Sequence, residues 1–221
     1  MVKLSVRLYT IYDMVAKGAV VADVGSDHGK LMIALFESGK IKKGYAIENK
    51  RGPYDRLVKA LEEEGIEQHV VPILSDGVSE LPISVDTVVL AGLGGGTVVD
   101  ILTSHKEKLK NVSTIIVDAH SALKEVREEI SNLGYVIADE KMVKEDDVYY
   151  EIIKFIRADI AFYSDKDLEF GPILREEKCS LFKEKYSSRI KQIDAILENK
   201  SLPSSRIEEL RQEKEKLSNI L

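Results

Sequence analysis

Cysteine and histidine are scarce in this chain of 221 residues, which contains a single cysteine, Cys179, and four histidines. One cysteine excludes an intramolecular disulfide framework and is typical of a protein of the reducing cytoplasm. The same scarcity argues against a structural zinc site, which needs several cysteine or histidine ligands held close together. We therefore expect a cytoplasmic protein without a bound metal.

Long apolar runs are also missing. No run approaches the roughly 18 residues that cross a membrane as a helix, although 44% of the residues are hydrophobic. The segment Met1–Arg7 lacks the apolar core of a signal peptide. These observations predict a globular protein with no membrane partner, and the length suits one large domain with a smaller appendage.

The chain has no overall excess of positive charge, since its formal net charge is -6. The charges are nevertheless divided unevenly: residues 1–60 hold 11 Lys or Arg against 6 Asp or Glu, and the remainder holds 21 against 32. Seven basic residues of the first part cluster within two predicted elements: Lys40, Lys42, Lys43, Lys50, Arg51, Arg56 and Lys59. Such a patch suits contacts with phosphates, and it equally suits a solvated surface that keeps the protein in solution.

A dinucleotide-binding G-x-G-x-x-G motif is missing at the place where a Rossmann-like sheet carries it. The apolar run Val20–Val24 predicts a buried parallel strand, and Leu31–Leu35 predicts the helix that follows. The loop between them reads D-x-G-x-x-x-G, with Asp23 at the strand end and Asp27 in the turn. Two carboxylates disfavour a diphosphate and suit an ammonium or sulfonium group. The loop therefore favours S-adenosylmethionine over NAD, and a tight acidic turn without a ligand is the alternative interpretation.

Strands and helices alternate through the first two thirds of the chain. Besides the strand Val20–Val24, strands are predicted at 44–48, 69–74, 85–91 and 113–117. Pro72 places the second of these near an edge, because proline cannot donate to a ladder. Helices are predicted from the N-cap Ser5 to Gly18, from Pro53 to Gly65, over 97–109 and over 121–133.

The last part of this region, residues 135–143 and 148–156, predicts a β-hairpin at the sheet edge. Strands that alternate with helices and end in a hairpin predict an α/β fold, a doubly wound Rossmann-like sheet with an antiparallel addition. We assign this domain to residues 1–160.

From about Asp165 the pattern changes to that of long helices. One stripe of a helix is formed by Phe182, Tyr186, Ile190, Ile193 and Leu197. After a break at 199–204, Ser205 and Glu208 predict a capping box for a second helix. We therefore expect a C-terminal α-helical hairpin, resembling a coiled coil, over residues 165–221. Gly171-Pro172 is its expected hinge, and core packing is the favoured role of the stripe.

Acidic residues and glycines stand at four successive strand ends. Glu48 lies 23 residues after Gly25, close to the ~20-residue offset at which an acid accepts hydrogen bonds from ribose hydroxyls. Asp76 follows the third strand, where a carboxylate can accept from an adenine amino group, and Gly92–Gly95 follows the fourth. Each feature alone is equally well explained by turn chemistry. Together, the acidic residues and glycines at four successive strand ends suit a ligand that contains an adenosine with an unphosphorylated ribose and a cationic tail.

Several motifs of the chain together resemble the TrmK family: Leu4–Leu8, Val24–His28, Asp76-Gly77, Ala91–Gly95, Tyr149–Ile152 and Phe170–Pro172. The resemblance implies an S-adenosylmethionine-dependent tRNA methyltransferase that modifies N1 of adenine 22. It also implies a class I methyltransferase domain with a coiled-coil-like C-terminal domain, and tRNA as the partner. The target base must then be unpaired and turned out of its stack to be reached.

Two segments depart from the family pattern. Asp27–Met32 stands where the family usually has Asp-His-Ala-Tyr-Leu-Pro, and Asp118-Ala119-His120 stands where it usually has Gln-Pro-Asn. Both lie near the expected acceptor pocket. Three alternatives therefore stay open: a non-catalytic homologue that binds S-adenosylmethionine or RNA, a methyltransferase for another RNA acceptor, and, disfavoured by the missing motif, an NAD-dependent oxidoreductase.

The residues at the strand ends and the resemblance to the TrmK family together predict a set of site residues. Cofactor contacts are predicted for Arg7, Asp23, Gly25, Ser26, Asp27, His28, Glu48, Asn49, Asp76, Gly77, Ala91, Gly92 and Leu93. Asp27 and Gly94 are predicted to serve the methyl transfer by easing the positive charge that develops on the adenine ring. For His28 and His120, packing or hydrogen bonding is favoured over catalysis. The oligomeric state is left open, with a monomer slightly favoured.

Overall fold

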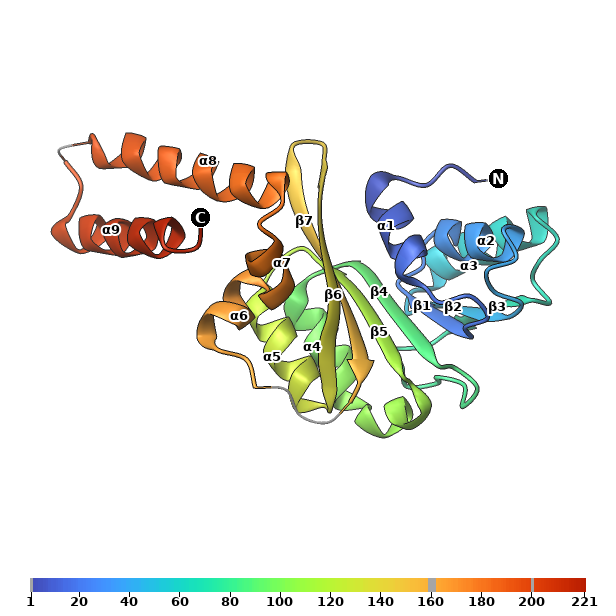
Figure 1. Ribbon diagram of the computed structural model, residues 1–221. Helices are drawn as coiled ribbons and strands as arrows, with labels where there is room; N and C mark the ends of the chain where they lie inside the picture. The colour runs from blue at the N-terminus through green and yellow to red at the C-terminus, as the bar shows by residue number, and fades with distance from the viewer. Residues whose placement is uncertain (1, 159–161, 200) are drawn as a thin grey trace.

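The computed structural model describes residues 2–158, 162–199 and 201–221. Within them a seven-stranded sheet has the order β3-β2-β1-β4-β5-β7-β6 (Figure 1). Its parallel strands are β1 (Val21–Val24), β2 (Gly44–Glu48), β3 (Val70–Leu74), β4 (Thr87–Leu93) and β5 (Thr114–Ala119). The antiparallel hairpin of β6 (Tyr135–Glu145) and β7 (Val148–Arg157) joins the sheet at β5. The predicted α/β sheet, its edge strand β3 and its antiparallel addition are confirmed.

Helices cover both faces of the sheet (Figure 1). One face carries α1 (Val6–Met14), α2 (Lys30–Glu37) and α3 (Arg51–Glu63), which share an apolar core with it. The other face carries α4 (Gly95–Ser104), the 3-10 helix η1 (Lys106–Asn111) and α5 (Leu123–Asn132). Because parallel strands all end at one edge, this arrangement brings the loops after β1, β2, β3 and β4 together.

Two helix ends on the first face differ from their predictions. α1 begins at the predicted cap, where Ser5 Oγ accepts from the amide of Leu8, but it ends at Met14 rather than Gly18. The buried Val15 already has an extended backbone, which turns the chain towards β1. α3 begins at Arg51, two residues before Pro53. Proline is still within the first turn there, where its missing N–H costs no helical hydrogen bond.

β4 is longer than predicted and the helix after it is shorter. β4 continues to Leu93, which pairs with Ala119 after a register shift at Gly92. Gly92 has φ 75°, a conformation suited to glycine, and the irregularity has the character of a β-bulge. The predicted helix over 97–109 is divided into α4 and η1, because His105 leaves the helical conformation between them.

The C-terminal part consists of α6 (Asp165–Phe170), α7 (Pro172–Glu177), α8 (Ser180–Leu197) and α9 (Ser204–Ser218). α8 and α9 form an antiparallel pair that extends away from the sheet (Figure 1). They share an apolar core with Phe170 of α6, Leu174 of α7 and Met142 of β6. The predicted helical hairpin is thus confirmed. The capping box at Ser205 and Glu208 is wrong: α9 follows Pro203 and has no side-chain cap.

A capping box does occur before α6, where Ser164 and Asp167 cap each other's backbone amides. The division into residues 1–160 and 165–221 stays a prediction, and residues 159–161 between the two parts lie outside the described residues. None of the described helices is both long and apolar enough to span a bilayer.

Candidate functional site

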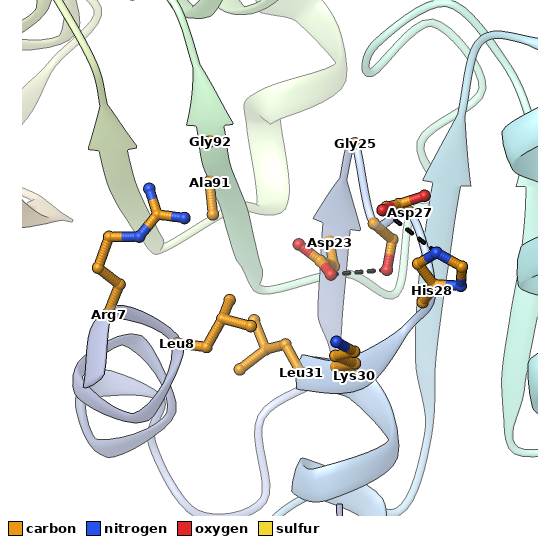
Figure 2. A pocket seen from close by; sticks show the side chains of 11 residues that line it. Arg7, Leu8, Asp23, Gly25, Asp27, His28, Lys30, Leu31, Ala91 and Gly92 are labelled. Carbon is orange, nitrogen blue, oxygen red and sulfur yellow. Dashed lines mark hydrogen bonds and ion pairs between the residues drawn. The ribbon is translucent and has the colours of Figure 1, made fainter. Parts of the chain in front are cut away.

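A cavity of about 310 Å³ opens beside α1, at the carboxyl ends of β1 and β4. Figure 2 shows Arg7 and Leu8 reaching towards it from α1, Asp23 from β1, and Lys30 and Leu31 from the start of α2. The remaining lining residues come from the loop after β1 and the end of β4: Gly25, Ser26, Asp27, His28, Ala91 and Gly92. The structure therefore brings eight of the predicted cofactor residues to one cavity.

The loop after β1 is held by hydrogen bonds that fix its two ends. The amide of Gly25 donates to the carbonyl of Ile47 at 2.9 Å, which ties the loop to β2. Gly25 has φ 79°, so a side chain there would be strained. Ser26 Oγ donates to Asp23 Oδ2 at 2.7 Å. Burial raises the pKa of Asp23 to about 6, the Ser26 hydroxyl works in the opposite direction, and the charge of Glu48 adds to the rise.

A second cavity, of about 110 Å³, continues from the first at Gly25, which lines both. It lies between the carboxyl ends of β1, β2 and β3 and the start of α4. Its lining comprises Val24, Gly25, Ile47, Glu48, Asn49, Ser75, Asp76, Gly77, Leu93, Thr97 and Ile101. Glu48 is buried, and its Oε1 accepts from the amide of Asp27 at 2.5 Å. The predicted strand-end residues of β2 and β3 are thus assembled in this smaller cavity.

The two residues predicted to act in catalysis have different positions. Asp27 lines the larger cavity with φ 43°, and its side chain is paired outward, 3.3 Å from Arg56 Nη2 and 3.7 Å from His28 Nε2. In Figure 2 it lies on the opposite side of Asp23 from Gly92. Gly94 lines neither cavity, and its carbonyl accepts from the amide of Val98 in the first turn of α4.

Arg7 connects the larger cavity to the ends of β5, β6 and β7. Its Nη1 lies 3.3 Å from Asp118 Oδ2 and 3.4 Å from His120 Nε2. Its Nε lies 3.6 Å from Glu145 Oε2, and its guanidinium carbon lies 4.3 Å from the centre of the Tyr150 ring. The segment Asp118–His120 at the end of β5, which departs from the family pattern, is therefore next to the cavity through Arg7. The contributions of Glu145 and Tyr150 were not predicted.

Sequence reasoning also missed several lining residues: Leu8, Lys30 and Leu31 in the larger cavity, and Ser75, Thr97 and Ile101 in the smaller one. A usable indication existed for some of them. In a doubly wound sheet the first turn of each helix after a strand faces the ligand crevice, and Lys30 and Thr97 both lie in such a turn. Leu8 belongs to the apolar stripe of α1, which gives no indication of a cavity.

The chemistry of the two cavities suits an elongated ligand with a cationic group at one end and hydroxyl groups in the middle. Asp23 and Asp27 provide acidic groups in the larger cavity, and Glu48 and Asp76 do so in the smaller one. Carboxylates attract cations and accept hydrogen bonds from hydroxyl and amino groups. Within the described residues, no group of three or more His, Cys, Asp or Glu side chains is placed to hold a metal ion.

Comparison with known proteins shows a similarity that spans the chain. Residues 21–221 match the model of a family described as TrmK, tRNA (adenine(22)-N(1))-methyltransferase. The tRNA (adenine(22)-N(1))-methyltransferase of Bacillus subtilis (strain 168) is 27% identical over 230 residues, covering 99% of this chain and 92% of the relative.

Two solved structures carry the same similarity into three dimensions. A putative tRNA (m1A22) methyltransferase of Streptococcus pneumoniae in complex with S-adenosyl-L-methionine is 29% identical, with a TM-score of 0.89 over 99% of this chain and 100% of the other. M. capricolum TrmK in complex with S-adenosyl-homocysteine is 26% identical, with a TM-score of 0.86 over 98% of this chain and 96% of the other.

Proposed function

This chain belongs to the TrmK family of tRNA (adenine(22)-N(1))-methyltransferases, and we propose that its two joined cavities carry out that reaction. S-adenosylmethionine is the methyl donor, and N1 of an adenine in tRNA is the acceptor, at position 22 as in the relatives. The family match over residues 21–221 is the observation that carries this conclusion. Since one chain lines both cavities, we propose a monomer as the working form, and a cytoplasmic location, which suits a tRNA substrate.

The residues present fit S-adenosylmethionine. Glu48 lies where it can accept hydrogen bonds from the ribose hydroxyls, and Asp76 where it can accept one from the adenine amino group of the cofactor. Asp23 supplies a buried negative charge beside the larger cavity, which suits the cationic amino acid end. Gly25 lines both cavities, and its φ of 79° is a backbone conformation that strains any residue with a side chain.

The remaining predicted residues take supporting roles in this proposal. Ser26 fixes Asp23, while His28 and Asp27 form the rim of the larger cavity. Asn49 and Gly77 line the nucleoside cavity, and Ala91 and Gly92 form the wall towards β5. Gly94 acts indirectly, by starting α4 and fixing the backbone after Gly92.

Bound S-adenosylmethionine supplies an electrophilic methyl group on a sulfonium, and its transfer leaves a neutral thioether. N1 of adenine carries a lone pair at neutral pH, so the protein has no proton to remove before attack. Its residues instead hold N1 in line with the methyl carbon, where positioning alone can contribute a large rate increase. The ring becomes positively charged, and the buried carboxylate of Asp23 at the cavity eases that charge electrostatically, whereas Asp27 is paired with Arg56 and His28 at the rim.

The α8–α9 hairpin, called the arm below, is proposed to dock the tRNA. It projects from the sheet on the same side of the molecule as the β6–β7 turn (Figure 1). Within the basic cluster between Lys40 and Lys59, two side chains already have acidic partners in α3: Arg51 pairs with Asp55, and Lys59 pairs with Glu63. Exposed Lys42, Lys43 and Lys50 are the better candidates for phosphate contacts.

The proposal is tested by transfer of a labelled methyl group from S-adenosylmethionine to two unmodified tRNA transcripts, with adenine or guanine at position 22. We expect incorporation into the adenine transcript only, and N1-methyladenosine on nuclease digestion. Binding of S-adenosylmethionine is measured on the same preparation. Tight binding without transfer to either transcript would contradict the proposal and indicate a binding protein, or an enzyme with another acceptor.

A further inference from the structure

A buried carboxylate lies on the acceptor side of the cavity. Asp118, near the end of β5, is only 1% exposed, and it pairs across the sheet with Ala91, which lines the larger cavity. Its side chain lies on the face of the sheet that carries α1, because Arg7 of α1 contacts it. Asp118 is thus one strand beyond the cavity wall, on the side away from Asp23.

The hydrogen bonding of this carboxylate is incomplete. Its Oδ2 lies 3.3 Å from Arg7 Nη1, whereas its Oδ1 has no hydrogen-bond partner among the described residues. Arg7 Nε is likewise buried and without a hydrogen-bond partner there. Leaving a buried polar atom unpaired is costly, and such atoms need a functional or structural reason. Asp118 therefore has one carboxylate oxygen without a hydrogen-bond partner beside the wall of the larger cavity.

Two aromatic rings flank the same place. His120 is exposed, and its ring meets that of Tyr150 edge to face, with centroids 5.5 Å apart. The His120 ring also lies against the cavity wall, since its Nε2 would be 3.8 Å from a Cβ added at Gly92. Rings of this kind provide surfaces on which a base turned out of its stack can pack.

We propose that Asp118 recognises the target base by accepting a hydrogen bond from its exocyclic amino group, N6 of adenine. The inference rests on the proposed function and names the acceptor-reading residue for it. Burial raises the pKa of Asp118, and the charges of Arg7 and His120 work in the opposite direction. In its ionised form the carboxylate only accepts hydrogen bonds, so it matches the amino group of adenine and opposes the carbonyl oxygen that guanine carries there. N1 and N6 share one edge of the ring, so a bond at N6 also aims N1 at the cavity.

The guanidinium of Arg7 can move away from Asp118 when the base binds. Arg7 is only partly buried and has a flexible side chain. Its Nε and its backbone amide both lie near the carboxylate of Glu145, which is a second anionic partner for it. Arg7 can therefore keep an ion pair with Glu145 while the amino group of the base bonds to Asp118. The transfer itself is unchanged: the N1 lone pair forms the bond to the methyl carbon, and the electrons of the broken C–S bond go to sulfur.

The test compares two tRNA transcripts, one with adenine and one with unsubstituted purine at position 22, because purine lacks only the amino group. For the wild-type enzyme, kcat/KM is expected to be about 10- to 100-fold higher with adenine, the effect of one charge-assisted hydrogen bond. Asp118→Asn keeps the shape and removes the charge, and should reduce this ratio about 10-fold. The exposed Asp100→Asn on α4 is the matched control and should keep the wild-type ratio.

The ratio of kcat/KM for the two transcripts distinguishes recognition of the base by Asp118 from a purely structural role. A structural defect would lower kcat/KM equally for both transcripts. A wild-type ratio near 1 would overturn the inference even if the variant failed to fold. A large ratio that Asp118→Asn leaves unchanged, with S-adenosylmethionine affinity intact, would also overturn it. Absence of transfer to either transcript by the wild-type enzyme would instead reject the proposed function, and this inference with it.

Discussion

Asp23 must be ionised to attract a cationic group, yet it lies where ionisation is disfavoured. Burial raises its pKa to about 6, well above the ordinary value for an aspartate. A cationic ligand in the larger cavity would stabilise the ionised form, so ligand binding and loss of the proton are coupled. The affinity of the cavity for a positive ligand should therefore depend on pH in a range where ordinary aspartates are fully ionised.

We predict that the affinity for S-adenosylmethionine falls as the pH is lowered through about 6, because Asp23 becomes protonated and loses its charge. A decrease of about 10-fold between pH 7.5 and pH 5 is expected, in line with one charge-assisted hydrogen bond. Isothermal titration calorimetry over this range provides the measurement. In Asp23→Asn the affinity should be lower at pH 7.5 and nearly independent of pH. Equal pH dependence in both proteins would show that another group is responsible.

The same pKa shift acts on folding with the opposite trend. Because the pKa of Asp23 is higher in the folded protein than in the unfolded chain, the folded protein holds the proton more tightly. The contribution of Asp23 to stability is thus fully present below about pH 4 and is lost as the pH rises through about 6. The site gives up some stability of the free protein to gain a charge for its ligand, as functional sites commonly do.

Single residues differ in how far their positions could be predicted. Glu48 and Asp76 line one cavity, and this proximity could be predicted because the strands of a parallel sheet end at a shared edge. Tyr150 and Glu145 come from an antiparallel hairpin whose register with β5 is set by packing. Their contact with Arg7 therefore depends on long-range pairing that no local pattern contains.

At the scale of elements, one buried arginine holds four of them together. Arg127 of α5 donates to Glu140 of β6 at 2.8 Å, to Glu151 of β7 at 2.6 Å and to the carbonyl of Leu168 in α6 at 3.1 Å. Glu140 in turn accepts from the amide of Ile173 in α7. Burial works against ionisation of Glu151, yet the charges of Arg127 and Lys185 hold its pKa below the usual value. Burial raises the pKa of Glu140, and Arg127 with the amides of Ile173 and Leu174 works in the opposite direction. The network fixes α6 and α7 to the hairpin.

We predict that Arg127→Met lowers the free energy of unfolding by about 3–5 kcal/mol, because it leaves Glu140 buried without a cation and Glu151 with Lys185 alone. The control is Arg189→Met, which breaks the half-exposed pair with Glu213 between α8 and α9 and should cost less than about 1 kcal/mol. Urea unfolding at pH 7.5 provides the comparison. Similar losses in the two variants would mean that the buried network contributes no more than a surface ion pair.

Element boundaries were harder to predict than elements. The capping-box pattern at Ser205 and Glu208 has the right residues, but Pro203 sets the start of α9 two residues earlier, because its fixed φ already suits that position. The extension of β4 to Leu93 depends on a bulge at Gly92 that pairs Leu93 with Ala119. Cross-strand pairing of this kind becomes visible only when both strands are in place.

For the whole molecule, the decisive feature is how the arm is fixed to the sheet. Near the start of α8, Glu184 accepts from Lys144 Nζ at 2.8 Å and from the Tyr149 hydroxyl at 2.7 Å, both in the β6–β7 hairpin. Lys185 Nζ donates to Glu151 at 2.7 Å. These contacts join the arm to the β6–β7 hairpin, which also carries Tyr150. If the arm docks the tRNA, they determine the direction in which the target base approaches the cavity.

A charge exchange between Lys144 and Glu184 tests this role. Lys144→Glu and Glu184→Lys each place like charges together, so each should loosen the arm and raise the KM for tRNA several-fold. The affinity for S-adenosylmethionine should not change. The double variant restores an opposite-charge pair with the wild-type net charge, and should restore the KM. Thermal unfolding should change little in all three, since the pair is exposed.

Simple attraction between the protein and the RNA gives a different pattern, which makes the exchange decisive. If only the local charge mattered, Lys144→Glu would weaken tRNA binding and Glu184→Lys would strengthen it, because RNA is negatively charged. Positioning by the arm instead requires both single variants to be impaired and the double variant to recover. Steady-state kinetics with one tRNA transcript at constant ionic strength distinguish the two, and opposite effects of the single variants would reject a positioning role for this contact.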